Sequence, residues 1–355
     1  MIFQAVCYRR ELPFKVVSSA KPSIVVIGDL HASLVLIERC AAVNVLQYSI
    51  SREVTSYLYN LFRMYARAVS RNIPVQDQLL IIFKLLMDSF VFDQSCEYIL
   101  LGDTVCDRGP NDLFVLVLMK KLYTEAQGKV SLVLSNHDHH FITSFVNLLK
   151  PMWRTARRNE VDFYIRGELW GGSTTAFEQY GSAYRFIKSL QNPLYNEYYM
   201  LHFPTEKSVM QFLMQMLVPW KVIQTESVEY IFTHAPLDYQ MVNKVLQRFC
   251  SKNARLTDPD CQTKALNKFL SSDQEWAFIW ARDSRGKLPT NWINVYGHTD
   301  EASCGLLPNA QRISLNCLDG QGEDTTVKDG CVGVFWSPQP LRRQNAVRAQ
   351  NIKGR

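Results

Sequence analysis

The sequence lacks an apolar run long enough to cross a bilayer as a helix. The most apolar stretch lies around Leu79 to Met87, is short, and contains Lys84. A spanning helix needs about 20 predominantly apolar residues. The N-terminus also has no charged head followed by a long apolar stretch, which a secretory signal would require. We therefore expect a soluble protein without a membrane span.

Closely paired cysteines are absent too. The chain has nine cysteines, an odd number, and none of them forms a Cys-x-x-Cys pair. Zinc fingers are built on such pairs, and secreted disulfide frameworks usually have an even number of cysteines. We expect neither. A reducing, cytoplasmic location is the simplest expectation, and the cytosol of a host cell satisfies it as well as that of the producing cell.

The chain also has no continuous basic stripe and no low-complexity segment. Its net charge is +6, and basic residues cluster only from Arg154 to Arg158 and from Arg342 to Arg355. Nucleic acid is therefore not an expected partner. Hydrophobic residues make up 47% of the sequence, enough for an extensive interior. We predict a single catalytic domain over residues 1–340 and a basic tail at 341–355.

Five short apolar runs each stop at a polar residue or a glycine, as buried strands do at the edge of a sheet. They are Ile24–Ile27, Tyr98–Leu101, Val130–Leu134, Glu229–Phe232 and Trp292–Tyr296. Helical spacing dominates between them, most clearly in Val54–Val69, Gln78–Phe92 and Asp112–Tyr123. This alternation of strands and helices predicts an α/β fold.

Two intervals are too long for simple connections between these elements. Residues 40–94 are largely helical in pattern, and residues 139–227 are rich in aromatic side chains. We predict that both are insertions on the core and that their aromatic residues mainly pack inside them. A lid or substrate platform over the active site is the alternative, because loops at strand ends often carry specificity.

Potential metal ligands follow all five predicted strands. They are Asp29 and His31, Asp103, Asn136 with its neighbour His137, His234, and His298. One such residue alone would have little weight, but open α/β sheets gather their sites at the carboxyl ends of the strands. Carboxylates, imidazoles and an amide oxygen suit divalent ions such as Mn²⁺, Fe²⁺ or Zn²⁺.

A pair of such ions, roughly 3.5–4 Å apart, can hold a hydroxide and aim it at phosphorus. One carboxylate must bridge the pair, and Asp103, which follows a central strand, is the predicted bridge. This chemistry needs no nucleophilic serine or cysteine. The sequence therefore predicts a two-metal phosphoesterase.

The ordered motifs resemble the calcineurin-like metallophosphoesterases, specifically the phosphoprotein phosphatase branch. They are Gly28-Asp-Leu-His31, Gly102-Asp-Thr-Val-Cys-Asp-Arg-Gly109, Ser135-Asn-His-Asp138, Thr233-His234-Ala and Tyr296-Gly-His-Thr299. Trp170-Gly-Gly-Ser-Thr174, Tyr180-Gly181 and Trp280-Ala-Arg282 are similar to segments of its bacterial members. The resemblance implies two central mixed β-sheets flanked by helices, an αββα sandwich, with helical insertions.

The resemblance also implies a role for each residue of the motifs. The first metal ion would be held by Asp29, His31 and Asp103, and the second by Asp103, Asn136, His234 and His298. Both would be divalent, with Mn²⁺ favoured and Fe or Zn as alternatives. His137 would be the general acid that protonates the leaving alkoxide, and Asp107 would orient it. Arg108 and Arg282 would clamp the phosphate oxygens.

The sequence departs from the family pattern at several positions. The extra residue Cys106 lengthens the Gly-Asp-x-x-Asp-Arg-Gly motif, so we expect Asp107 and Arg108 in a bulged or shifted loop. Asp138 replaces the usual Glu, and Ser135 replaces the usual Gly before the Asn. We expect these two changes to alter the support of the loop without removing a ligand.

Three functions remain open from the sequence. The first is hydrolysis of phosphomonoesters on a protein substrate by a hydroxide held between two metal ions, with phosphoserine or phosphothreonine favoured and phosphotyrosine as an alternative. The second is hydrolysis of dinucleoside polyphosphates such as diadenosine tetraphosphate. The third is an inactive binding scaffold. The insertions and basic tail also resemble those of effector phosphatases that bacteria such as Legionella deliver into host cells by non-classical secretion, which implies host-cell proteins as partners.

Overall fold

The protein is described here by a computed structural model. The described residues are 1–9, 14, 16–17, 21–105, 111–148, 186, 189–205, 208–250, 255–271, 277–281, 287–298, 305–306, 311–315 and 329–336. Three predicted site residues, Asp107, Arg108 and Arg282, lie outside these ranges, as do Cys106 and the basic tail. The predicted division into domain and tail therefore stays a prediction.

The larger sheet contains most of the predicted core strands. Its order is β1-β13-β2-β5-β6-β7. The bounds are β1 Ile2–Arg9, β13 Asp329–Trp336, β2 Ile24–Ile27, β5 Glu97–Leu100, β6 Val130–Val133 and β7 Leu217–Val218. Strands β2, β5, β6 and β7 are parallel, whereas β13 is antiparallel to both of its neighbours. The sheet is therefore mixed.

A second mixed sheet contains the two remaining predicted strands. Its order is β11-β12-β10-β9-β8. The bounds are β11 Gly305–Leu306, β12 Arg312–Ser314, β10 Trp292–Tyr296, β9 Glu229–Thr233 and β8 Lys221–Gln224. The central strand β10 is parallel to β9 and β12, and the two outer pairs are antiparallel.

The two sheets pack against each other through alternate residues of their strands. In β2, Ile24 and Val26 belong to a buried cluster that also contains Phe232 and Val295 of the second sheet. Val25, between them, belongs to the separate and larger cluster that includes helix residues. Because side chains alternate between the faces of a strand, one strand contributes to both layers of the core.

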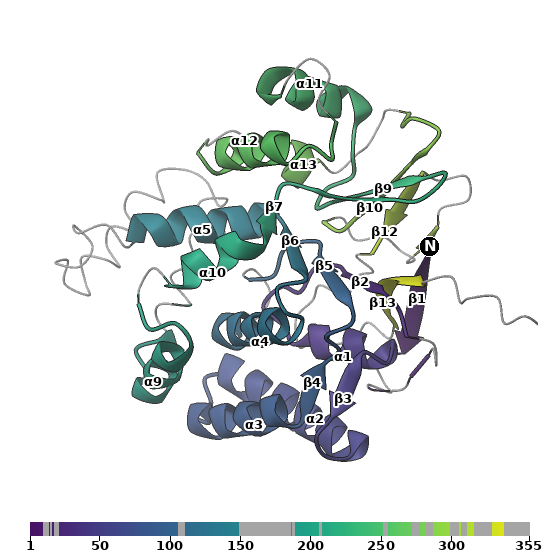
Figure 1. Ribbon diagram of the computed structural model, residues 1–355. Coiled ribbons are helices and arrows are strands. Elements are labelled where there is room, and N and C mark those ends of the chain that lie inside the picture. The colour runs from purple at the N-terminus through teal and green to yellow at the C-terminus, as the bar shows by residue number, and fades with distance from the viewer. Residues whose placement is uncertain are drawn as a thin grey trace, which may run out of the picture.

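Helices cover the outer faces of the two sheets (Figure 1). Helices α1 and α4 lie beside the larger sheet, and α11, α12 and α13 lie beside the smaller one. Their bounds are α1 Val35–Ala42, α4 Asp112–Glu125, α11 Tyr239–Phe249, α12 Pro259–Leu270 and α13 Ala277–Trp280. Helix α5, Asn136–Leu148, follows β6. The predicted α/β class and the two mixed sheets are thus observed, whereas the calcineurin-like assignment stays a prediction.

The interval 40–94 forms a helical pair closed by a small sheet. Helices α2 (Arg52–Ser70) and α3 (Gln76–Asp88) lie between β3 (Leu46–Tyr48) and β4 (Phe90–Phe92), which pair antiparallel. The predicted helix over Gln78–Phe92 is wrong at its end, because its last residues form β4. Phe90 and Phe92 are buried while the residue between them is exposed, which is the period of a strand.

The interval 139–227 contributes to both main sheets. Its described helices are α5, α9 (Pro193–His202) and α10 (Ser208–Met216). After α10 the chain forms β7, at the edge of the larger sheet, and β8, at the edge of the smaller one. The C-terminal part of this interval therefore belongs to the core. In the described part of the chain, no helix is both long and apolar enough to span a membrane.

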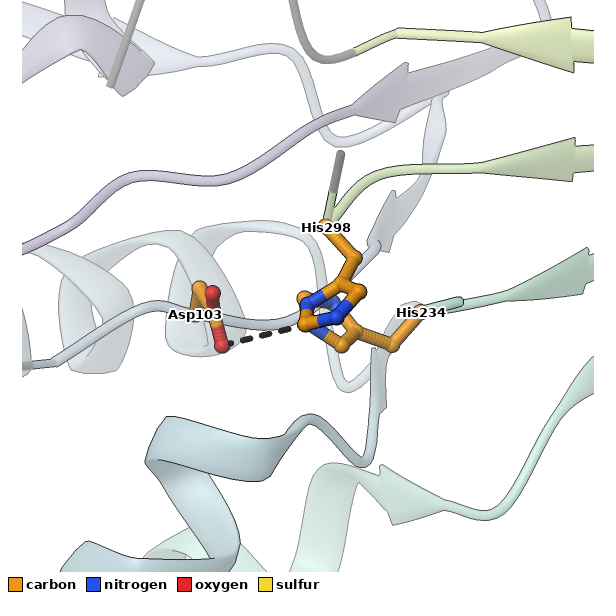
Figure 2. Close-up of side chains that lie close together, drawn as sticks. All are labelled: Asp103, His234 and His298. Carbon is orange, nitrogen blue, oxygen red and sulfur yellow. Dashed lines mark hydrogen bonds and ion pairs between the residues drawn. The ribbon is translucent and has the colours of Figure 1, made fainter. Parts of the chain in front are cut away.

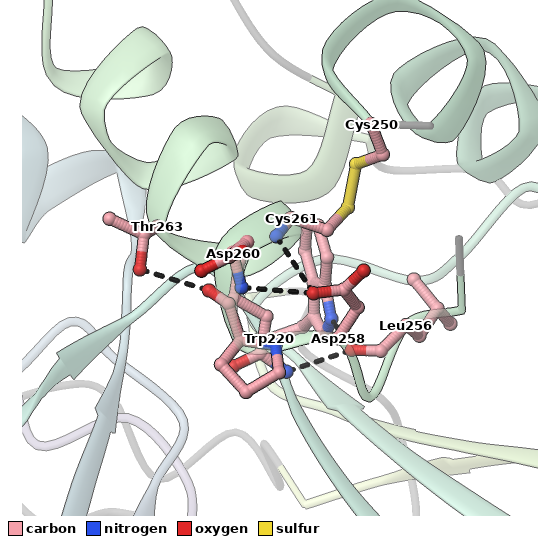
Figure 3. The surroundings of a disulfide bond; sticks show 9 residues. Trp220, Cys250, Leu256, Asp258, Asp260, Cys261 and Thr263 are labelled. Atoms are coloured by element: carbon pink, nitrogen blue, oxygen red, sulfur yellow. Dashed lines mark hydrogen bonds between the residues drawn. A yellow bond between two sulfur atoms is a disulfide. The ribbon is translucent and has the colours of Figure 1, made fainter. Parts of the chain in front are cut away.

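One disulfide joins the end of α11 to the start of α12 (Figure 3). Cys250 and Cys261 are 11 residues apart in the sequence, and their Cα atoms are separated by 5.0 Å. The Asp258 side chain accepts hydrogen bonds from the Asp260 and Cys261 amides and so caps α12 beside the bridge. We expected no disulfide framework, and this local bridge was not predicted. Spacing alone did not reveal it, because helix packing brings the two cysteines together.

Candidate metal centre

The predicted metal ligands lie just beyond the carboxyl ends of strands from both sheets. Asp29 and His31 follow β2, Asp103 follows β5, and Asn136 opens the helix after β6. His234 and His298 follow β9 and β10 of the second sheet. The structure therefore brings all six predicted ligands to one edge of the two packed sheets, although they are spread over about 270 positions of sequence.

The backbone is strained where these ligands are presented. His31, Asp103 and His298 have positive φ angles of 46°, 47° and 64°. Non-glycine residues rarely adopt this left-handed conformation, which costs on the order of 1–3 kcal/mol at each position. Such strain persists only where the surrounding structure enforces it, and it clusters at functional sites. The strain at three ligand candidates therefore indicates a site that was shaped for binding.

Backbone hydrogen bonds join the loop after β2 to the loop after β5. The Leu30 and His31 amides both donate to the Asp103 carbonyl, at 3.1 and 2.6 Å. The Ala32 amide donates to the Thr104 carbonyl at 3.1 Å. These bonds fix Asp29 and His31 relative to Asp103.

Glycines allow the loops to approach closely. A Cβ at Gly297 would collide with the carboxylate of Asp29, and a Cβ at Gly28 would lie 2.6 Å from the Leu315 carbonyl oxygen. The Asp29 carboxylate also accepts a hydrogen bond of 2.9 Å from the His298 amide. Any side chain at position 297 would therefore displace a candidate ligand, which explains why Gly297 precedes His298.

The first ligand cluster contains Asp29, His31 and Asp103, all of them buried. Each residue has one ligand atom within 4.8 Å of the ligand atoms of the others. The His31 Nε2 atom is 3.7 Å from Asp29 Oδ2 and 3.9 Å from Asp103 Oδ2. This is the residue set that the resemblance implies for the first ion.

The second cluster contains Asp103, His234 and His298 (Figure 2). The His234 Nε2 atom lies 3.4 Å from Asp103 Oδ1 and 3.1 Å from His298 Nδ1. The Asn136 Oδ1 atom lies 2.8 Å from the same nitrogen. Asp103 therefore belongs to both clusters, as the predicted bridging ligand should.

The hydrogen bonding of His234 determines which nitrogen faces the cluster. Its Nδ1 atom is 2.9 Å from the Leu101 carbonyl oxygen, which can only accept a hydrogen bond. The hydrogen of the neutral ring therefore belongs on Nδ1, and Nε2 directs its lone pair toward Asp103 and Asn136. A backbone carbonyl that fixes the tautomer in this way is typical of metal-binding histidines.

A buried asparagine supports the loop that presents His234. Asn294 in β10 is fully buried, and its side-chain amide donates to the Ile231 carbonyl and the Thr233 hydroxyl. Its side-chain oxygen accepts from the Leu237 amide at 2.8 Å. The chain on both sides of His234 is thus attached to the neighbouring strand.

The pKa values of Asp103 and His234 are both lowered in the folded protein, which favours the deprotonated form of each side chain. Burial alone would raise the pKa of Asp103, but the nearby histidines, with His234 first, hold that pKa well below its ordinary value. Burial lowers the pKa of His234, partly against the charge of Asp103. A charged carboxylate beside a neutral imidazole is the state in which both can bind a metal ion.

The predicted general acid, His137, lies at the same edge. Its amide donates to Asp103 Oδ1 at 3.3 Å, and its Nε2 atom is 3.9 Å from Asp103 Oδ2. Its side chain is 19% exposed, whereas that of Asp103 is 2% exposed. A substrate can therefore reach His137 from solvent. Asp107, its predicted partner, lies outside the described residues.

The neighbouring histidines, which we did not assign to the site, have other surroundings. The His139 Nε2 atom is 3.0 Å from the Phe269 carbonyl oxygen at the end of α12. Burial, together with the nearby His139 and His137, lowers the pKa of His140 to about 4. Neither residue belongs to the two clusters found among the described residues.

Arg39 is a supporting residue that the sequence motifs do not reveal. It lies on α1, is fully buried, and donates from Nη1 to the carbonyl oxygens of Gly28 and Asp29, at 2.8 and 3.0 Å. Its guanidinium therefore holds the loop that carries the first ligand. The sequence places Arg39 ten residues after Asp29 but gives no other sign of this role. An arginine in a helix is normally expected on the surface.

The donor set of both clusters fits divalent ions. Carboxylates, imidazoles and an amide oxygen converge there, and electron-pair donors held this close are best accommodated around a cation. The described cysteines Cys40, Cys96 and Cys331 are buried elsewhere and belong to neither cluster. The set is therefore compatible with Mn²⁺, Fe²⁺ or Zn²⁺.

Comparison with known proteins gives an independent result. Residues 98–272 match the sequence model of the WipA-like phosphatase domain. That range includes Asp103, Asn136, His137 and His234, but it includes neither Asp29 nor His298. No curated protein matches the chain.

Among solved structures, the phosphatase domain from the Legionella effector WipB is similar to this chain. The two share 17% sequence identity with a TM-score of 0.43, over 71% of this chain and 80% of the other. Residues 98–272 of this chain thus match a WipA-like phosphatase domain, and the phosphatase resemblance indicated by the motifs is confirmed at that level.

Proposed function

We propose that this protein is a metal-dependent phosphoprotein phosphatase that hydrolyses phosphomonoesters by direct attack of water on phosphorus. The observation that carries the proposal is that Asp103 is shared by two ligand clusters. A shared carboxylate is the arrangement that two-metal phosphatases require. The match of residues 98–272 to a phosphatase domain supports the same chemistry.

Each cluster would hold one divalent ion, with Mn²⁺ favoured. Asp29, His31 and Asp103 would bind the first ion, and Asp103, Asn136, His234 and His298 the second. When bound, the ions would lower the pKa of an attacking water and neutralise charge on the phosphoryl oxygens. No nucleophilic side chain is needed, so no covalent phosphoenzyme is formed.

The remaining chemical task belongs to His137. An alkoxide of serine or threonine is a poor leaving group and must be protonated as its bond to phosphorus breaks. His137 lies beside the shared carboxylate with part of its ring exposed, so it can hold a proton next to the leaving oxygen. We assign Asp107 to orient it, and Arg108 and Arg282 to bind phosphate oxygens, on their places in the sequence motifs.

We propose a phosphorylated protein of a host cell as the substrate, with phosphoserine or phosphothreonine favoured. The motifs resemble those of protein phosphatases, and the solved structure described above is a domain of an effector. The insertion formed by α2 and α3 adds a surface beside the core that a small substrate would not need.

Phosphate release from three substrates tests the proposal. A phosphothreonine peptide, a phosphotyrosine peptide and diadenosine tetraphosphate would each be incubated with purified protein in Mn²⁺ or in excess chelator, with Asp103→Asn as the inactive control. We expect metal-dependent release from the phosphothreonine peptide. Cleavage of the dinucleotide alone would identify a dinucleoside polyphosphate hydrolase. Metal binding without any cleavage would favour a binding scaffold.

A further inference from the structure

A buried carboxylate joins the two loops that carry Asp103 and Asn136. Asp138 lies in the first turn of α5, two residues after Asn136, and only 2% of its surface is exposed. It is absent from both ligand clusters. Its carboxylate instead contacts residues that precede it by about 34 positions in the sequence.

The contacts are a set of hydrogen bonds to the loop after β5. The Thr104 amide donates to Asp138 Oδ1 at 3.1 Å, and the Thr104 hydroxyl donates to the same oxygen at 2.5 Å. The Val105 amide lies 3.4 Å from that oxygen. Thr104 directly follows Asp103, so these bonds fix the backbone on the carboxyl side of the shared ligand.

The other carboxylate oxygen is held by the start of α5 itself. The Ser135 hydroxyl donates to Asp138 Oδ2 at 2.8 Å and accepts from the Asp138 amide at 3.0 Å. Ser135 therefore caps the helix whose first residue is Asn136, in a variant of the capping box. A single side chain thus ties the helix cap to the loop after β5.

Burying the Asp138 carboxylate costs free energy, so a gain in stability does not by itself explain its position. A carboxylate removed from water must have its lone pairs satisfied, or it costs several kcal/mol. Asp138 meets that requirement by spanning two ligand loops. Asp103 and Asn136 must keep a fixed separation to hold one ion. The bonds of Asp138 join their segments, in addition to the bond of 3.3 Å from the His137 amide to Asp103 Oδ1.

We propose that Asp138, acting through Thr104, is a positioning residue that sets the affinity of the site for divalent metal. The inference rests on the proposed function, because it assigns Asp103 and Asn136 to metal binding. Asp138 itself touches neither metal nor substrate. It acts by keeping the shared carboxylate at the distance from Asn136 that one ion requires.

Calorimetric titration of Mn²⁺ into metal-free protein tests this role directly. Thr104→Val removes the 2.5 Å hydrogen bond but keeps the charge of Asp138 and nearly the same volume. We expect it to weaken Mn²⁺ binding by about 10-fold to 100-fold, the usual effect of losing a partner that orients a metal ligand. Asp138→Asn should show a loss at least as large. Thr104→Ser, which restores the hydroxyl, should recover most of the affinity.

Thr55→Val is the matched control. Thr55 is also fully buried, and its hydroxyl bonds the Ser51 and Ser89 carbonyls in the insertion, away from the ligand loops. This variant should lose stability but retain wild-type Mn²⁺ affinity. A positioning role further predicts that the phosphatase activity of Thr104→Val recovers as the Mn²⁺ concentration rises to saturation.

The outcomes separate this inference from the proposed function. If the wild-type protein binds Mn²⁺ and both Thr104→Val and Asp138→Asn bind it equally tightly, Asp138 is only structural and the inference is wrong. If Asp138→Asn does not fold, the comparison of the valine and serine variants at position 104 still decides. If the wild-type protein binds no divalent ion, the proposed function fails, and the inference fails with it.

Discussion

His137 is the residue whose proposed role is most sensitive to the substrate. His137→Asn should lower kcat by about 100-fold or more for an alkyl phosphate such as a phosphothreonine peptide, because the leaving alkoxide needs a proton. For p-nitrophenyl phosphate, whose leaving group needs no proton, kcat should change little. Steady-state kinetics on both substrates at saturating Mn²⁺ provide the measurement.

His202→Asn serves as the control for this substitution, because His202 lies at the end of α9 and outside both clusters. It should leave both rates at the wild-type level. An equal loss of activity on the two substrates by His137→Asn would rule out proton donation and leave His137 with a role in binding.

Arg39 makes a second prediction at the level of a residue. Arg39→Met removes the donor to the Gly28 and Asp29 carbonyls and leaves both oxygens buried without it. We expect a loss of about 2–3 kcal/mol in the free energy of unfolding, since hydrogen bonds to charged groups are worth about that much. Mn²⁺ affinity should fall as well. Urea denaturation and calorimetry measure the two effects.

Arg71→Met is the matched control, because Arg71 is exposed at the end of α2. It should change the free energy of unfolding by less than about 0.5 kcal/mol. If Arg39→Met were as stable as this control, Arg39 would not be supporting the Asp29 loop.

The sequence allowed the ligand residues to be predicted, and it marked Ser135 and Asp138 as support for a loop, but it did not predict the contacts that provide this support. Asp29, Asp103 and His234 stand at strand ends, where a local pattern identifies them. Arg39 lies within a helix whose neighbouring residues look ordinary, and the bond from Thr104 to Asp138 crosses 34 positions. Both supports depend on tertiary packing, which a local sequence pattern does not specify.

At the scale of elements, all five strands predicted to precede ligands are present, with small shifts at their ends. Their continuous apolar character reflects burial on both faces, which gives a clear signal. The predicted helix over residues 78–92 was too long because Phe90–Phe92 pairs with Leu46–Tyr48. A short apolar run can fit the period of a helix or that of a strand. Here, pairing with the distant strand β3 makes Phe90–Phe92 a strand.

An ion pair between the exposed Lys21 and the buried Asp93 stabilises the segment that joins the insertion to β5. Lys21 Nζ donates to Asp93 Oδ2 at 2.7 Å, and Asp93 Oδ1 accepts from the amide and hydroxyl of Ser95. Burial by itself would raise the pKa of Asp93, but the bonds from Lys21 and Ser95 lower it below its ordinary value of 3.8. The ionised form is therefore favoured in the folded protein.

This lowered pKa predicts a pH-dependent contribution to stability. A depressed folded-state pKa contributes stability that is present above the unfolded value and is lost as pH falls through the folded value. Asp93→Asn should therefore lower the free energy of unfolding by about 1 kcal/mol at pH 7, and the difference should shrink below pH 3.8. Urea titrations of both proteins across that range measure it. A difference that stays constant with pH would contradict the assignment.

At the scale of the whole molecule, the site depends on the packing of the two sheets. The first cluster draws its ligands from loops of the larger sheet, and the second combines Asp103 with His234 and His298 from the smaller one. The pairing of β1 with β13 brings distant parts of the chain together and completes the larger sheet. That pairing was not predicted, because neither strand precedes a motif.

The measurement that most directly tests the account is the Mn²⁺ stoichiometry of three proteins. Calorimetric titration of metal-free wild-type protein, Asp103→Asn and His298→Ala would count the ions that each binds. Because Asp103 belongs to both clusters and His298 to one, we predict two ions for the wild type, one tightly bound ion for His298→Ala, and weakened binding of both for Asp103→Asn. If Asp103→Asn lost only one ion, or if the wild type bound none, the shared-carboxylate centre would be contradicted.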